Sequence, residues 1–246
     1  MATFQNITTP NYCVPCAPIL SALPSPTTIN CPATPNFITP TVTNGCLSTS
    51  LTFADVTTPS STCPLKYSIT RTWTASNSCY SATASQTINV QDVTPPVIAP
   101  LPAISTINCP AVPNFATATA TDACGGTVTL TFADVTTPSS TCPLKYSITR
   151  TWTAKDNCNN SSTASQTINV IDNTPPVIAS LPAISTINCP AVPNFATATA
   201  TDACGGIVTL TFADVTTPGT CAGNYSITRT WTAKDNCNNS STASQT

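Results

Sequence analysis

The sequence predicts an all-β protein built from three tandem antiparallel β-sandwich domains that are stapled by disulfide bonds. Near-literal repetition within the chain predicts the tandem arrangement. Alternation of polar and apolar residues over segments of strand length predicts the sheets. Fourteen cysteines at recurring spacings predict the disulfide bonds.

The repetition divides the chain into units of about 80 residues. The stretch "ITRTWTAKDNCNNSSTASQT" occurs at 148–167 and again at 227–246, and residues 101–126 are identical to 181–206. Solenoid coils have periods of about 20 to 50 residues, so a longer period favours self-contained domains. The expected boundaries are 1–22 for an N-terminal extension, 23–96 for repeat 1, 97–176 for repeat 2 and 177–246 for repeat 3.

Within repeat 2 the pattern is that of β-strands. Segments 127–135 and 145–154 alternate cleanly and are rich in Thr, Val, Ile, Tyr and Trp. Segments 103–108, 115–121 and 162–172 complete the expected set, with Gly-Gly, "TTPSS" and "NCNNSS" as turns. Short strands separated by regular turn signals indicate antiparallel sandwiches of the immunoglobulin type.

The cysteines indicate an oxidising, extracellular setting. Only Cys13 and Cys16 have the CxxC spacing of a metal knuckle, and the other twelve stand about 15 to 18 residues apart, which favours disulfides. In repeat 2, alternating strand directions place Cys109 and Cys142 at one end and Cys124 and Cys158 at the other. A bridge needs Cα atoms within about 7 Å, so bonds are expected between cysteines at the same end.

The expected pairs are therefore Cys31–Cys63, Cys46–Cys79, Cys109–Cys142, Cys124–Cys158, Cys189–Cys221 and Cys204–Cys237. Cys13 and Cys16 are expected to close a tight local loop or to lock neighbouring subunits together.

Composition excludes several classes of function. The net charge is −2 with only seven basic residues, which argues against nucleic-acid binding. The absence of histidine excludes Ser-His and Cys-His catalysis and histidine metal sites, and we expect no enzyme activity and no catalytic residues. No apolar run approaches the roughly 20 residues of a membrane span, and no signal peptide is recognisable.

The stretches "ATATDACGG", "YSITRTWTAKDNC" and "DNTPPVI" resemble the hyalin-repeat (HYR-like) modules of bacterial secreted adhesins and surface proteins. The resemblance covers residues 23–246. It implies an immunoglobulin-like fold, export, and a role in adhesion or stalk-building. Many relatives carry an additional cysteine in the last strand where this chain has alanine in "TASQT", so the disulfide pairing of the family is not transferred.

The nine aspartates fall into two positional groups. Asp134 should lie on the same face as Val128, Leu130 and Phe132, facing Arg150, and we expect a structural ion pair with the arginine stacked on Trp152. Asp55 and Asp214 occupy the same position in the other repeats.

The other six aspartates are expected to meet where one repeat follows another. Strand directions bring together Asp92, Asp122 and Asp156 at the first junction, and Asp172, Asp202 and Asp235 at the second. Clustered carboxylates suit Ca²⁺, and no other cofactor is expected. The alternative is that each aspartate caps a turn. Repeat 1, which no repeat precedes, has Asn44 and Asn77 at the matching positions.

Repeat 3 ends at Thr246, before the strand that closes the other two repeats. The N-terminal segment, which includes Phe4 and Ile7, resembles that missing strand. We hypothesise that this segment of one subunit completes the last repeat of its neighbour by strand addition, which generates a filament. The alternative is that the chain is part of a longer array.

These observations predict a non-enzymatic protein of the cell surface or extracellular space that serves as a stalk or filament subunit with itself as principal partner. The alternative is a carbohydrate- or receptor-binding module of a large adhesin. No nucleic-acid partner and no membrane span are expected.

Overall fold

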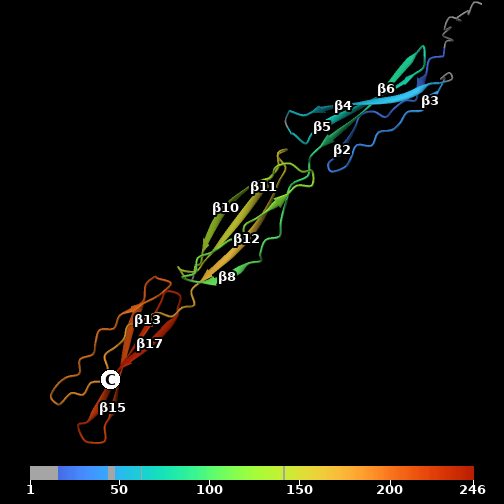
Figure 1. Ribbon diagram of the computed structural model, residues 1–246. Coiled ribbons are helices and arrows are strands. Elements are labelled where there is room, and N and C mark those ends of the chain that lie inside the picture. The colour runs from blue at the N-terminus through green and yellow to red at the C-terminus, as the bar shows by residue number, and fades with distance from the viewer. Residues whose placement is uncertain (1–15, 44–47, 62, 141) are drawn as a thin grey trace, which may run out of the picture. The chain divides into compact units, whose positions relative to one another are not determined.

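A computed structural model of the chain describes residues 16–43, 48–61, 63–140 and 142–246 (Figure 1). These residues form strands, turns and loops without a helix, and the predicted all-β fold of tandem immunoglobulin-like domains is confirmed. The chain forms two compact units. One comprises Met1–Ala99, Thr119–Leu130 and Thr153–Ser162, and the other Pro100–Ala118, Thr131–Trp152 and Thr163–Thr246.

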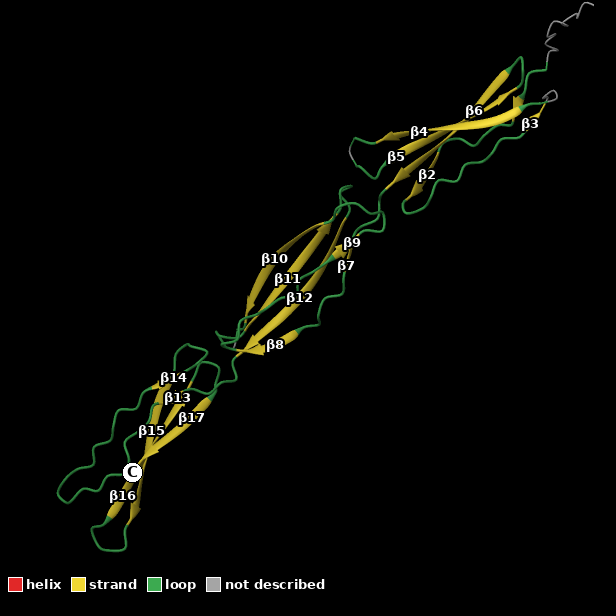
Figure 2. Cartoon of the chain, in the orientation of Figure 1, coloured by secondary structure: helices red, strands yellow, loops and turns green. Residues whose placement is uncertain are grey.

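Each repeat is organised around one main sheet (Figure 2). In repeat 1 the sheet contains β4 (Ser50–Pro59), β5 (Tyr67–Ser76), β6 (Ser81–Gln91) and β2 (Thr27–Asn30). In repeat 2 it contains β10 (Thr129–Pro138), β11 (Tyr146–Lys155), β12 (Ser161–Ile171) and β8 (Ser105–Asn108). In repeat 3 it contains β15 (Thr209–Pro218), β16 (Tyr225–Lys234) and β17 (Ser240–Gln245).

The long strands are antiparallel, but the fourth strand of repeats 1 and 2 is parallel to its neighbour. In repeat 2, β8 pairs with the last four residues of β12, with Ser105 opposite Ile168 and Asn108 opposite Ile171. In repeat 1, β2 pairs in the same way with residues 88–91 of β6. The last third of β6 and β12 therefore lies between two strands, and its alternate side chains Ile88, Val90, Ile168 and Val170 are at most 3% exposed.

The layer facing the main sheet is mostly loop. Its only regular pieces among the described residues are short pairs: β1 (Ile19–Leu20) with β3 (Val42–Thr43), β7 (Val97–Ile98) with β9 (Ala120–Thr121), and β13 (Val177–Ile178) with β14 (Ala200–Thr201).

The strand predicted at 115–121 is therefore wrong over most of its length. The backbone amide of Ala116 donates to Oε1 of the buried Gln166 at 3.0 Å rather than to another strand. Gln86 and Gln245 hold the loops of the other repeats in the same way, through Ile38 and Ala196.

A small core lies between these layers. In repeat 2 it consists of Trp152, Ala154, Ile168 and Val170, each at most 5% exposed, with Phe115 meeting Trp152 edge-on at 6.3 Å between ring centroids. Repeat 1 has the same core, whereas repeat 3 has Trp231 and Ala233 without counterparts of the isoleucine and valine. The difference follows from the end of the chain at Thr246, because those two residues belong to the last third of the closing strand.

Beside the core, the structure contains the predicted ion pair between Arg150 and Asp134, but the arginine lies between two phenylalanine rings rather than on Trp152. Nε and Nη2 of Arg150 donate to the two carboxylate oxygens of Asp134 at 2.7 and 2.8 Å. The guanidinium lies 3.9 Å from the ring centroid of Phe132 and 4.5 Å from that of Phe115, closer than the 5.9 Å to Trp152. The equivalent pairs Arg71–Asp55 and Arg229–Asp214 have the same geometry.

Repeats 2 and 3 show how far one strand depends on another. Residues 105–108 and 185–188 share the sequence "STIN", yet the first forms β8 and the second is not a strand. The partner of β8 is residues 168–171 of β12, and repeat 3 has no counterpart of that segment in this chain. No helix in the described part of the chain is long and apolar enough to span a membrane.

Candidate functional site: the junctions between repeats

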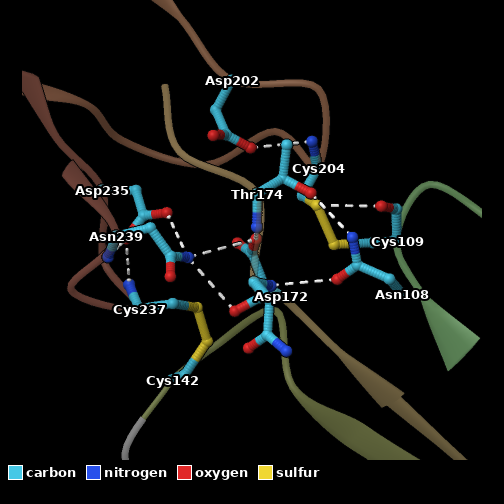
Figure 3. The surroundings of a disulfide bond; sticks show 11 residues. Asn108, Cys109, Cys142, Asp172, Thr174, Asp202, Cys204, Asp235, Cys237 and Asn239 are labelled. Carbon is cyan, nitrogen blue, oxygen red and sulfur yellow. Dashed lines mark hydrogen bonds between the residues drawn. A yellow bond between two sulfur atoms is a disulfide. The ribbon is translucent and has the colours of Figure 1, made fainter. Parts of the chain in front are cut away.

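Disulfide bonds join consecutive repeats instead of closing each repeat on itself. One compact unit contains Cys31–Cys124 and Cys63–Cys158, which link repeat 1 to repeat 2. The other contains Cys109–Cys204 and Cys142–Cys237, which link repeat 2 to repeat 3 (Figure 3). Their Cα atoms are 4.7 to 5.2 Å apart, within the range for a disulfide.

The predicted pairing within repeats is therefore wrong. The bonds that the structure contradicts are Cys31–Cys63, Cys109–Cys142, Cys124–Cys158, Cys189–Cys221 and Cys204–Cys237. Cys13 and Cys46 lie outside the described residues, so Cys13–Cys16 and Cys46–Cys79 stay predictions. Cys16 and Cys79 are both disulfide-bonded.

The prediction grouped the cysteines by end correctly but chose the wrong partners. Cys109 and Cys142 do share one end of repeat 2, because both reach cysteines of repeat 3. The error was to treat a repeat as isolated. Each end of repeat 2 meets another repeat that also presents two cysteines, so every cysteine of repeat 2 has a partner across a junction.

At the second junction, Asp172 of the linker forms hydrogen bonds within the linker and with the next repeat (Figure 3). Asp172 is 5% exposed, and its Oδ1 accepts from the backbone amide of Thr174 at 3.1 Å. Nδ2 of Asn239 donates to the backbone carbonyl of Asp172 at 3.1 Å and to Oδ2 of Asp235 at 2.8 Å. The amide of Asn239 thus joins the linker to the β16–β17 turn of the next repeat. Asn160, Asp92 and Asp156 repeat the arrangement at the first junction.

The remaining aspartates cap turns, as the alternative reading of the sequence expected. Oδ1 of Asp202 accepts from the amide of Cys204 at 2.7 Å, and Oδ1 of Asp235 accepts from the amides of Cys237 and Asn239 at 2.8 Å. Each cap fixes the backbone beside a bridging cysteine. Asn77 takes this role in repeat 1, where it accepts from the Cys79 amide and donates to the carbonyl of Cys16 at 2.9 Å.

The predicted calcium sites at Asp92, Asp122 and Asp156, and at Asp172, Asp202 and Asp235, stay predictions. Asp92, Asp122, Asp172 and Asp202 each have a buried Oδ2 without a hydrogen-bond partner, which suits a cation. Within the described residues, however, the groups of candidate ligand atoms that converge within 4.8 Å combine one aspartate with two cysteines of the junction disulfides. Disulfide sulfur is a poor substitute for the oxygen ligands that Ca²⁺ requires.

Burial sets the electrostatics of the linker aspartates. Burial raises the pKa of the Asp172 carboxyl, the hydrogen bond from Thr174 lowers it, and the negative charges of Asp202 and Asp235 raise it again, with a net upward shift. Asp92 is shifted upward for the same reasons. By contrast, the hydrogen bond from Arg229 holds the pKa of Asp214 below its ordinary value.

At each junction, the second glycine of a Gly-Gly pair packs against a leucine of the preceding repeat. Gly205 and Gly206 have φ angles of +85° and +89°, which L side chains rarely adopt. A Cβ atom on Gly206 would lie 2.9 Å from Cδ1 of Leu144, a residue of repeat 2, whereas a Cβ atom on Gly205 would meet nothing within 4 Å. Gly126 and Leu65 form the same contact at the first junction.

Comparison with known proteins gives a family and a set of structural neighbours. The model of the family described as "HYR-like domain with 4 cysteines" matches residues 97–170 and 177–246. None of the curated proteins matches the chain.

The solved structures that it resembles include three cadherin fragments. The fragment of protocadherin gammaB7 (EC3-6) is 14% identical, with 93% of this chain and 76% of that chain covered and a TM-score of 0.34. Human CDH23 EC21-23 is 18% identical, with 74% of each chain covered and a TM-score of 0.31. Drosophila N-cadherin EC1-4 is 11% identical, with 93% and 74% covered and a TM-score of 0.32.

Paired serine substitutions test the crossed disulfides. Cys142→Ser with Cys237→Ser removes one bond between repeats 2 and 3 and leaves no orphan thiol, so we expect a loss of about 3–4 kcal/mol in the free energy of unfolding. Cys109→Ser with Cys142→Ser removes two bonds and leaves two thiols, so the loss should be larger. Denaturant unfolding and thiol titration measure both. Equal thiol counts in the two variants, or two new thiols only in the first, would contradict the pairing.

Alanine at each of the two glycines separates backbone strain from contact. Gly205→Ala and Gly206→Ala share the cost of a positive φ, about 1–2 kcal/mol. Only Gly206→Ala also collides with Leu144, so it should cost about 1 kcal/mol more in thermal unfolding. Adding Leu144→Ala should reduce the extra loss. If the two alanine variants melt at the same temperature, the packing of Leu144 against repeat 3 is refuted.

Asparagine at position 172 tests whether the buried, charged carboxylate lowers the free energy of unfolding. The raised pKa means that Asp172 stabilises the fold when protonated and loses that contribution as pH rises through its folded-state pKa. Asp172→Asn should therefore stabilise the protein at pH 7 by about 1 kcal/mol and have little effect below pH 4. A bound calcium ion would reverse the sign at pH 7 and make melting sensitive to a chelator.

Asp214→Asn is the matched control for that experiment. Its pKa is lowered by Arg229, so its contribution is present at neutral pH and is lost as pH falls. The variant should be destabilised at pH 7 and should approach the parent protein in acid, opposite to Asp172→Asn.

Proposed function

Because the chain belongs to the family of HYR-like domains with four cysteines, we propose that it is an extracellular structural protein, a stalk or tether that resists extension and displays or anchors an adhesive surface. The observation that carries this proposal is the set of four disulfides between consecutive repeats. Such bonds persist in the oxidising conditions outside the cell, which supports the extracellular location.

The pairing creates two covalent paths through repeat 2. One path enters at Cys124 and leaves at Cys109, and the other enters at Cys158 and leaves at Cys142. Tension applied along the chain is thus carried through repeat 2 by the backbone segments 109–124 and 142–158 and by the disulfide bonds, and most of repeat 2 lies outside these segments. Disulfides within each repeat would resist the unfolding of that repeat. They would leave the linker as the only covalent connection between consecutive repeats.

The two paths are also matched in length. Between residue 100 and residue 245, one path runs through residues 100–109 and 204–245, and the other through residues 100–142 and 237–245. Each path contains roughly 50 residues, or about 175 Å when fully extended. Paths of equal length become taut together, so two bridges share the tension at the junction.

Self-assembly into filaments is a second, alternative candidate function. Repeat 3 has only the first part of the closing strand, as β17, and lacks the last third that β6 and β12 supply in the other repeats. An open strand edge of this kind accepts a strand from another polypeptide. The donor that the sequence suggests, with Phe4 and Ile7, lies outside the described residues, whereas the acceptor edge ends at the described Thr246.

Single-molecule extension tests the tether. Attachment points introduced by bio-orthogonal labels at residues 100 and 245 should give a limiting length of about 175 Å when oxidised and about 500 Å after reduction. Bonds confined within repeats would instead leave about 80 residues in the path, or about 280 Å. A limiting length near 280 Å, or one unaffected by reductant, would refute the proposed mechanical role.

A further inference from the structure

The far end of repeat 3 contains a groove of about 370 Å³. It is lined by residues 184–187, 189, 191–195 and 223–227, together with Gln245 and Thr246. In repeat 2 the corresponding space holds residues 168–171 of β12, which lie between β8 and β11. The groove therefore lies where repeat 2 has a four-residue segment of its closing strand.

The walls of the groove expose apolar side chains that a strand would cover. Ile187 is 46% exposed and Tyr225 is 52% exposed, whereas their counterparts Ile107 and Tyr146 are half-buried in repeat 2. In repeat 2 the side chains that fill this space are Ile168 and Val170, both 2% exposed. An occupant of the groove must therefore present two apolar side chains at alternate positions.

The backbone of the groove is aligned for a parallel strand. The amide of Ser185 donates to the carbonyl of Thr246 at 3.3 Å, immediately before the point where the pairing of β8 with β12 starts in repeat 2. Residues 185–188 have the same sequence as β8, so the edge is competent to pair once a partner strand is present.

Two free thiols stand at the same end of the repeat. Cys189 and Cys221 are exposed and are the free cysteines of the described residues. Their counterparts are Cys31 and Cys63 in repeat 1, and Cys109 and Cys142 in repeat 2. All four of those counterparts are bonded to the repeat that follows. Cys189 and Cys221 thus match the two cysteines that repeats 1 and 2 each use to bond to the repeat that follows.

We propose that this end of repeat 3 is a covalent docking site for a further HYR-like repeat. The strand that precedes that repeat fills the groove, and its cysteines at the positions of Cys204 and Cys237 bond to Cys189 and Cys221. Each bond forms by oxidation of two thiols, with loss of two protons and two electrons to a disulfide oxidant such as glutathione disulfide or a disulfide oxidoreductase. The inference rests on the proposed tether function and names its partner.

The cysteines favour this occupant over a second copy of the chain. Docking requires free cysteines of the Cys204 and Cys237 type. In the described part of this chain, the cysteines at those two positions, including Cys79, Cys124 and Cys158, are already in disulfides. A further repeat that no other repeat precedes supplies them, whether it follows in the same polypeptide or arrives in another.

An extended chain tests the covalent half of the proposal. A copy of residues 168–246 is added after Thr246, the protein is oxidised, and its disulfides are mapped by proteolysis without reduction and mass spectrometry. We expect Cys189 and Cys221 to bond to the added copies of Cys204 and Cys237. Cysteines that pair within the added repeat, or thiols that stay free, overturn the docking site.

The same map distinguishes the two proposals. The four junction bonds of the parent sequence serve as the internal control. If they are present and only the new junction fails, the docking inference is wrong and the tether stands. If they too are absent, the tether proposal itself is wrong.

A peptide tests the groove without the cysteines. The hexapeptide of residues 167–172, "TINVID", should bind the full parent chain and shift the NMR signals of Ile187 and Tyr225. The same peptide with Ile168→Ser and Val170→Ser should bind at least tenfold more weakly. A peptide of residues 1–12 is the competitor. If it binds more tightly than "TINVID", or if neither peptide binds, the assignment of the groove to a following repeat is overturned.

Discussion

The crossing of disulfides between repeats is the constraint on which the rest of the structure depends. A repeat of about 80 residues with one tryptophan, one isoleucine and one valine at its centre has a thin core. Cross-links add stability by restricting the unfolded chain, and here they also fix each repeat to its neighbour. The turn-capping aspartates, the linker and the glycine–leucine contact all lie beside the bridging cysteines, so one set of interactions determines both stability and mechanical continuity.

The sequence predicts most of the fold because its local signals agree with the final structure. Alternation identified the long strands, and placing Asp134 opposite Arg150 was correct because both positions are fixed by the register of two adjacent strands. The grouping of Cys109 with Cys142 was also correct. These inferences need only strand direction and periodicity, which a single repeat contains.

What the sequence did not reveal depends on neighbours that lie outside a repeat. The cysteine partners require knowledge that two repeats meet end to end, which spacing within one repeat does not contain. Segment 115–121 alternates like a strand, yet Gln166 captures its backbone, a side-chain effect without a sequence signature. Residues 105–108 and 185–188 are identical and still differ in structure, because only the first has a partner strand.

Disulfide mapping of the intact chain tests the central claim most directly. Digestion without reduction, followed by mass spectrometry, should yield linked peptides that join Cys109 to Cys204 and Cys142 to Cys237, with the matching pairs at the first junction. Linked peptides that join Cys109 to Cys142 and Cys204 to Cys237 would contradict the account. Each repeat would then be closed on itself, and only the linker would connect consecutive repeats covalently.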